Sequence, residues 1–336
     1  MNRRLLAISF ILSSLIILVS SMGVAAAKPH QDPTVSVLAS GLGSTSGSTV
    51  GPDGALYVAE RAASGRILRV DPHTGDVTEF ASGLPQAQIF LGGVVDVAFI
   101  DNTAYALVTV VDDPVLGGGS DVAGIYRVDG PNSFSLIGDI STFSMNNVPT
   151  NTDIALVTGV QYAMEIFKGE FLVTDGHHNR VLRVTLDGEV SEMIAFDNKV
   201  PTGLEVRGSL VYMAQAGPTP HHPEDGKVVK FRRYSSTATE VAAGARLIVD
   251  VEYGRGRTLY GLSEGEWNGG GAGAPAFEDT GALFEANRDG TFTEIVSGLD
   301  RPTSLEFIGK TAYVVTMDGE ILQIDGVGNP PYGRSR

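Results

Sequence analysis

Hydrophobic and polar residues alternate along short runs of this chain, and the runs recur at a regular spacing. Gly51–Asp71 contains one complete unit: a Pro-Asp-Gly turn opens the apolar run Ala55–Ala59, and a second run, Arg66–Val70, follows after a loop. Short runs with a period of two, bounded by Gly, Pro and Asp, are typical of strands joined by tight turns. The pattern therefore predicts a β-protein built of meanders.

The unit repeats to the end of the chain. Further apolar runs precede and follow each copy, which gives four strands a repeat with a period of about 40–55 residues, as in propeller blades. We expect an all-β fold, a six-bladed β-propeller of four-stranded antiparallel blades, over residues 34–326. A β-sandwich and a two-domain β protein are the alternatives. Runs that match Ile67–Val70 begin at Ile125, Val181, Val228, Leu283 and Ile321.

The last repeat lacks its outer strand, and the chain's beginning supplies a match for it. Val35–Leu42 has the pattern of Val77–Leu84 and Phe292–Leu299, including the Ser-Gly-Leu that closes each. We expect this N-terminal strand to complete the last blade. Such closure removes the open sheet edges that would otherwise pair with other chains.

The N-terminal segment has the features of an export signal. Arg3 and Arg4 precede the apolar stretch Leu5–Val19, and Ala25–Ala27 offers a small-residue cleavage site. Residues 1–27 are therefore predicted to be a signal peptide, 28–33 a linker and 327–336 a disordered tail. A single membrane anchor is the alternative, although the apolar stretch is short for a span. The mature protein is expected to be a secreted or periplasmic monomer that is not attached to a membrane.

Composition and net charge exclude several kinds of site and disfavour one class of partner. The 336 residues include no cysteine, which excludes disulfides and thiolate sites. The formal net charge of −15 disfavours a nucleic-acid partner, because an acidic protein repels phosphate backbones. No phosphate-binding or dinucleotide fingerprint occurs, and no nucleophile elbow. Ser44, Ser46 and Ser48 are interpreted as part of a Gly/Ser-rich turn.

Two loops contain pairs of histidines. Such loops of a propeller meet on one face, around the axial channel, so the two pairs could converge. Imidazole and carboxylate groups bind zinc, and carboxylates bind calcium, so a divalent metal site is one hypothesis. The other hypothesis is that these histidines are exposed to solvent and bind no ligand. The candidate ligands are Asp175, His177, His178, His221 and His222.

Other polar residues in or beside the long loops are candidates for ligand binding. Asn146, Asn147 and Asp153 belong to an oxygen-rich segment that could hold calcium or a polar ligand, although Asn and Asp also make turns with their own backbone. Trp267, the one tryptophan, could stack on a flat ligand or pack over its own blade. Gln161, Thr202 and Gln215 complete the predicted set.

Glutamates recur in the innermost predicted strands. Carboxylates that line a channel could bind a cation or do acid–base work with a raised pKa. A repeated group usually serves the repeat instead, and pairing with Arg69, Arg127 or Arg183 is the structural alternative. The recurring residues are Glu165, Glu205, Glu252 and Glu306.

Several of these motifs resemble the ScyD/ScyE family of exported propellers, named from the scytonemin pigment gene cluster. Gly51–Glu60, Asn146-Asn147-x-Pro149, Val200–Leu204, Gly217-Pro218-x-Pro220 and Asp289–Thr291 carry the resemblance, which covers nearly all of the mature chain. It implies a six-bladed ring, export and a role near an aromatic, indolic pigment. More distantly, Asp175 with Asn179–Val181 is similar to NHL blades, and the whole chain to the superfamily of SMP-30 lactonases and strictosidine synthases. Thr158–Tyr162 departs from the family pattern.

The expected function is a non-catalytic module that binds a small molecule or an extracytoplasmic protein at the loop face. The alternative is a metal-dependent, lactonase-like hydrolase with its metal in the axial funnel. A purely structural surface protein is a third possibility.

Overall fold

The computed structural model describes residues 32–61, 65–150, 152 and 154–327. The predicted signal peptide, the linker up to Gln31, residue Asp153 and the tail beyond Val327 lie outside this part of the chain.

The described residues form six sheets of four antiparallel strands, as the repeat predicts. Three short helical segments lie between strands: η1 (Pro114–Leu116), α1 (Ile140–Asn146) and η2 (Arg255–Arg257). The strands are β1 (Thr34–Ala39), β2 (Thr45–Val50), β3 (Leu56–Glu60), β4 (Arg66–Val70), β5 (Val77–Ala81), β6 (Gly93–Ile100), β7 (Thr103–Thr109), β8 (Gly124–Gly130), β9 (Ser133–Asp139), β10 (Gln161–Phe167), β11 (Glu170–Asp175), β12 (Arg180–Val184), β13 (Val190–Ala195), β14 (Pro201–Arg207), β15 (Leu210–Gln215), β16 (Lys227–Phe231), β17 (Thr239–Ala243), β18 (Ile248–Tyr253), β19 (Leu259–Ser263), β20 (Gly281–Ala286), β21 (Phe292–Leu299), β22 (Pro302–Ile308), β23 (Thr311–Thr316) and β24 (Ile321–Asp325).

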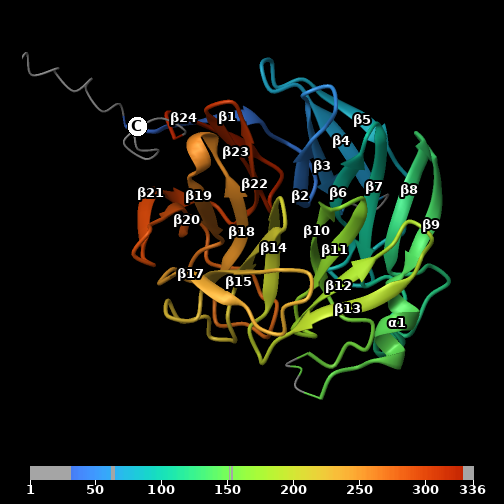
Figure 1. The fold of residues 1–336 in the computed structure, drawn as a ribbon. Coiled ribbons are helices and arrows are strands. Elements are labelled where there is room, and N and C mark those ends of the chain that lie inside the picture. The colour runs from blue at the N-terminus through green and yellow to red at the C-terminus, as the bar shows by residue number, and fades with distance from the viewer. Residues whose placement is uncertain (1–31, 62–64, 151, 153, 328–336) are drawn as a thin grey trace, which may run out of the picture. The chain divides into compact units, whose positions relative to one another are not determined.

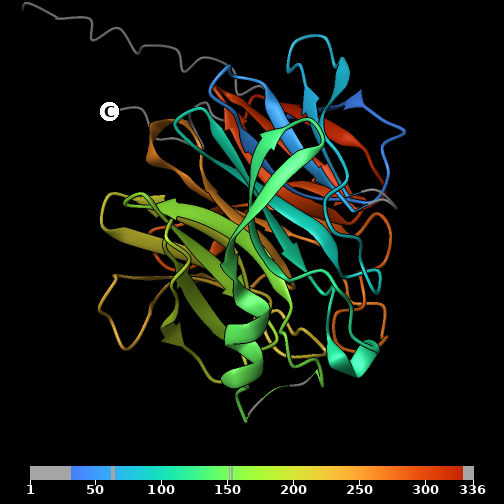
Figure 2. The ribbon, with the colours of Figure 1, turned by 90° about the vertical axis from the view of Figure 1, so that its right-hand side faces the viewer.

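The first strand of the fold completes the last blade. β1 pairs with β24 in antiparallel register, with Val37 opposite Leu322, so the sixth sheet has the order β1-β24-β23-β22. Figures 1 and 2 both show the blue N-terminal strand beside the red C-terminal strands. The prediction that the N-terminal strand closes the ring is confirmed.

The blades are numbered one to six in chain order by their innermost strands, which are β2, β6, β10, β14, β18 and β22. These strands surround the centre of the propeller (Figure 1). Each innermost strand contacts the innermost strands of the two neighbouring blades. An apolar cluster fills each junction between blades. At the closing junction, for example, Leu56 and Val58 of β3 pack with Val315 of β23 and Ile321 of β24. Burial of both faces of every blade is the main force that holds such a ring together.

Two sequence interpretations are wrong. Thr45–Val50 is the innermost strand of blade one, not a turn. Its residues are small because the strand lies close to its neighbour: a Cβ on Gly47 would lie 2.2 Å from Oδ1 of Asp96. The described residues also include one α-helix that no periodicity indicated. Helix α1 begins after Asp139, whose carboxylate accepts the N–H of Thr142 as an N-cap.

Within the described residues, no helix is long and apolar enough to cross a membrane.

Candidate functional site

A cavity of about 110 Å³ lies on the axis of the propeller. The innermost strands of all six blades contribute to its wall. At one end, here called the mouth, it is bordered by the connections between blades and by the loops that follow the second strand of several blades. The mouth-lining side chains include Arg61, Leu91, His177, Val200, His221, Leu247, Glu264, Ala274 and Met317. The gathering of these loops around one end of the channel agrees with the expectation from the fold.

Arg61 is the only Lys or Arg among the described residues that line the cavity. One terminal nitrogen, Nη1, donates to the carbonyl of Phe90 at 3.0 Å, and Nη2 donates to Oγ of Ser46 at 3.0 Å. The third nitrogen, Nε, is buried and has no hydrogen-bond partner. Burial lowers the pKa of the guanidinium, and the charges of Tyr162 and Glu264 oppose that effect.

Glu264 is the acidic group of the mouth. Its Oε1 accepts the backbone N–H of Ala276 at 2.9 Å. Burial raises the pKa of this carboxyl to about 7, although the hydrogen bond from Ala276 and the charge of Arg61 act in the opposite direction. Glu264 therefore changes its charge near neutral pH, in a cavity that also contains a fixed cation.

Two histidines line the mouth with their rings held by the protein. Nε2 of His177 and the hydroxyl of Tyr162 lie 2.9 Å apart. Nδ1 of His221 lies 3.2 Å from the carbonyl of Ala216, so this nitrogen carries a proton and donates it. Trp267 packs edge-to-face on His221, with ring centroids 6.1 Å apart, and its buried indole N–H has no partner.

Below the mouth, Asp96 and Asp250 join neighbouring blades. The carboxylate of Asp96 accepts the N–H of Val97 at 2.8 Å and that of Met164, in the next blade, at 2.7 Å. Three blades further on, the carboxylate of Asp250 accepts the N–H of Val251 and that of Leu305, in the next blade, each at 2.8 Å. Desolvation raises the pKa of both carboxyls, to about 7 for Asp250. Both carboxylates satisfy backbone N–H groups at β-bulges, so their role is structural.

The recurring glutamates occupy one level of four consecutive blades. Glu205, Glu252 and Glu306 each lie opposite a tyrosine of the second strand, and Glu165 opposite a leucine. Desolvation is the main cause that raises all four pKa values, with a value of about 8 for Glu165.

The suggested pairing of these glutamates with arginines of the third strand is wrong. Arg69 and Arg127 instead bind Asp53 and Asp129, with nitrogen–oxygen distances of 2.7 and 2.6 Å. Arg183 binds Glu170 at 2.5 Å. A strand alternates its side chains between two faces, so residues in first and third strands need not meet even where the strands share a sheet.

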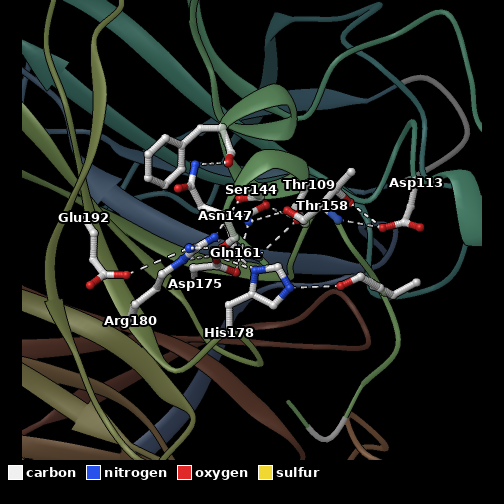
Figure 3. Close-up of polar contacts among 12 residues, drawn as sticks. Thr109, Asp113, Ser144, Asn147, Thr158, Gln161, Asp175, His178, Arg180 and Glu192 are labelled. Carbon is white, nitrogen blue, oxygen red and sulfur yellow. Dashed lines mark hydrogen bonds and ion pairs between the residues drawn. The ribbon is translucent and has the colours of Figure 1, made fainter. Parts of the chain in front are cut away.

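Asp175 and His178, two of the predicted metal ligands, belong to a buried network that Figure 3 shows. Oδ2 of Asp175 accepts Nε of Arg180 at 2.9 Å and lies 3.1 Å from Nδ1 of His178. Nε2 of His178 lies 3.0 Å from the carbonyl of Leu156 and donates to it. All three side chains are almost fully buried.

Arg180 connects this network to helix α1. Its terminal nitrogens donate to the carbonyl of Asn147 at 2.8 Å and to Oγ of Ser144 at 3.0 Å (Figure 3). Gln161 extends the network into blade two, because its Oε1 accepts the hydroxyl of Thr109 at 2.6 Å. These contacts indicate a structural function for the network, which joins two blades and the α1 connection.

The remaining predicted residues are scattered. The amides of Asn146 and Asn147 donate to carbonyls one turn back in α1, so both serve the local turn. Thr202 lines the cavity, but its hydroxyl donates to the carbonyl of Ile248 in the next blade. Gln215 is buried at the end of β15, and His222 is exposed.

Of the predicted metal and ligand-binding residues, the structure brings only His177, His221 and Thr202 to the cavity wall. Three of the recurring glutamates, Glu165, Glu252 and Glu306, also line it, as the channel hypothesis expects. Within the described residues, no group of three or more His, Asp or Glu side chains could hold a metal ion. Asp153 lies outside the described part of the chain. The metal hypothesis therefore has no assembled ligand set among the residues that the structure places.

The sequence analysis predicted the two histidines of the mouth but missed its charged groups, Arg61 and Glu264. Arg61 follows the second strand of blade one, and Glu264 holds the matching position in blade five. A search for charged residues directly after second strands would have found both, and both side chains line the cavity. It would not have shown that the two belong to one cavity.

No protein-family model matches the chain, and no curated protein matches it in sequence. Solved structures do match. The PQQ-bound aldose sugar dehydrogenase of Streptomyces coelicolor is 16% identical with a TM-score of 0.61, over 89% of this chain and 99% of that one. A gluconolactonase of Xanthomonas campestris is 12% identical with a TM-score of 0.59, over 88% and 90%. Virginiamycin B lyase of Staphylococcus aureus is 14% identical with a TM-score of 0.53, over 88% and 99%. At this identity the likeness shows the fold alone.

Proposed function

We propose that this protein is a non-catalytic binding propeller of the ScyD/ScyE type that works outside the cytoplasm and takes a small molecule into the mouth of its axial cavity. The observation that carries the proposal is the composition of the mouth. A few polar groups, Arg61, His177, His221 and Glu264, converge over an apolar wall that includes Leu247. Concave sites with this mixture are typical of small-molecule binding.

A lactonase-like hydrolase is the second candidate. Glu264 favours it, because a carboxyl with a pKa of about 7 in a cavity suits general acid or base catalysis. Arg61, which is half-buried, could also stabilise a developing negative charge. Hydrolysis of simple lactones that is lost in Glu264→Gln would support this candidate over simple binding.

Binding can be followed through Trp267, because it is the protein's only tryptophan and packs on His221 at the mouth. We expect a panel of small molecules of varied charge to include some that change its fluorescence saturably. Ala274→Phe, which adds a ring at the mouth, should abolish that binding. Ala272→Phe is the matched control, because it lies in the same loop but outside the cavity wall. Equal binding by both variants would place the ligand elsewhere and refute the proposal.

A further inference from the structure

The unpaired donor of Arg61 points to the chemistry of the ligand. An arginine has five N–H donors, and a buried donor without an acceptor loses its hydrogen bond to water without replacement. Four buried side-chain polar atoms of the described residues lack a partner, and Nε of Arg61 is the only one that belongs to a charged group. This arrangement is costly to the free protein unless something else supplies an acceptor.

Arg61 is also held in place without being neutralised. Its bonds to Phe90 and Ser46 fix two nitrogens of the planar guanidinium, and both acceptors are uncharged. Other arginines of this acidic chain, such as Arg69 and Arg183, have carboxylate partners instead. A pre-positioned guanidinium with a free edge is suited to a carboxylate, which accepts two parallel N–H bonds.

The rest of the mouth suits an apolar body attached to that group. Leu91, Leu247, Val249 and Met317 line the same cavity as Arg61. The volume of about 110 Å³ is of the same order as the ~150 Å³ apolar cavity that takes benzene in another protein. A compact ring or short chain with one carboxylate is therefore the ligand class that matches both the volume and the wall.

We propose that the ligand of the axial cavity is a small organic carboxylate, whose oxygens accept hydrogen bonds from Arg61 while its apolar body packs against Leu247 and Val249. This inference rests on the proposed function and specifies its ligand.

The charges around Arg61 predict how binding depends on pH. The titratable groups at the mouth are Tyr162, His177, His221 and Glu264. The recurring glutamates lie three residues further from the mouth, along the innermost strands, than Ser46. Three residues of a strand span about 10 Å. Asp96 and Asp250 also line the cavity, below the mouth, where backbone N–H groups hold both carboxylates. Glu264 is the carboxyl whose charge acts on Arg61. It changes charge near pH 7, and its ionised form would repel a bound carboxylate. Carboxylate binding should be tighter at pH 6 than at pH 8.5.

The experiment compares benzoate with benzamide, which has the same shape without the charge, by calorimetry and by Trp267 fluorescence. We expect benzoate to bind at least about tenfold more tightly, because hydrogen bonds to charged groups are the stronger ones. Arg61→Gln should remove this preference, and Arg61→Lys should keep part of it. Arg246→Gln is the control, since Arg246 pairs with Glu266 outside the cavity wall and should not affect binding.

A second variant keeps the test valid if Arg61→Gln fails to fold. Glu264→Gln should leave benzoate binding at pH 8.5 as tight as at pH 6, because the repelling charge is gone. Equal affinity for benzoate and benzamide, or no saturable benzoate binding, would overturn the inference. The proposed function survives that result if a neutral ligand binds and Ala274→Phe blocks it, so the two failures can be told apart.

Discussion

The carboxylate of Asp96 accepts the backbone N–H of Met164 at 2.7 Å and so ties blade two to blade three. The bond lies beside the axis, where neighbouring innermost strands come close enough for one short side chain to reach the next backbone. Gly47, on the other neighbouring strand, leaves the space that this carboxylate occupies. This crowding beside the axis leads to the first of four predictions.

Gly47→Ala should destabilise the fold by about 1–3 kcal/mol, the usual cost of overpacking. The added Cβ would lie 2.2 Å from Oδ1 of Asp96 and 2.8 Å from the carbonyl of Val95, so a strand must shift. Gly130→Ala is the matched control, because a Cβ there would find its nearest neighbour at 3.9 Å. Urea unfolding measures both. Equal stabilities would show that the innermost strands have more room than the structure indicates.

Arg180→Met should destabilise the protein by about 3–5 kcal/mol, because it leaves the buried Asp175 charge without its cation. Arg183→Met, three residues along the chain, should cost about 0–1 kcal/mol, since its pair with Glu170 is partly exposed. Thermal unfolding compares the two. The double variant Asp175→Asn/Arg180→Met should be more stable than Arg180→Met alone, and a less stable double variant would contradict this account of the network.

Unfolding free energy should fall as pH rises from about 4.5 towards 8. Burial raises the pKa of Glu165 from 4.5 to about 8, so in this range the folded protein keeps a proton that the unfolded chain has lost. Glu264 and Asp250, each with a pKa of about 7, act in the same direction. Exposed Asp71 and Asp129, whose pKa values are lowered by hydrogen bonds, add a loss of stability in strong acid.

Urea unfolding across this pH range tests the relation. Glu165→Gln cannot ionise and should reduce the slope, while Glu294→Gln, at an exposed strand position, should leave it unchanged. A stability that rises between pH 5 and pH 8 would show that the channel carboxyls are ionised in the folded protein.

Deletion of Thr34–Ala39 should lower the melting temperature and produce oligomers. Without β1, strand β24 becomes an open edge that can pair with another chain. A chain that starts at Asp32 and keeps β1 is the control, and size-exclusion chromatography with light scattering reports the association state. A stable monomer without these residues would mean that the closing strand contributes little.

Much of the fold could be predicted from the sequence, because each strand of a propeller repeats a local pattern. The runs around Ile67, Ile125 and Val181 identified the third strands, and the Ser-Gly-Leu match identified β1 as the partner of β24. Thr45–Val50 was missed because its residues are small where Asp96 of the neighbouring blade leaves little space. A local sequence pattern does not show such a contact between blades. Helix α1 was missed because seven residues give too little periodicity.

The sequence by itself determined the six repeats, the closing strand and the end of the ring at which loops gather, because periodicity and turn residues are local properties. Only the tertiary structure decided which polar side chains share a space. It placed His178 in a buried network with Asp175, and it brought Arg61 and Glu264, about two hundred residues apart in the chain, to one cavity. The pKa shifts of Arg61 and Glu264 come from desolvation and from charges on other blades, and both depend on how the ring closes.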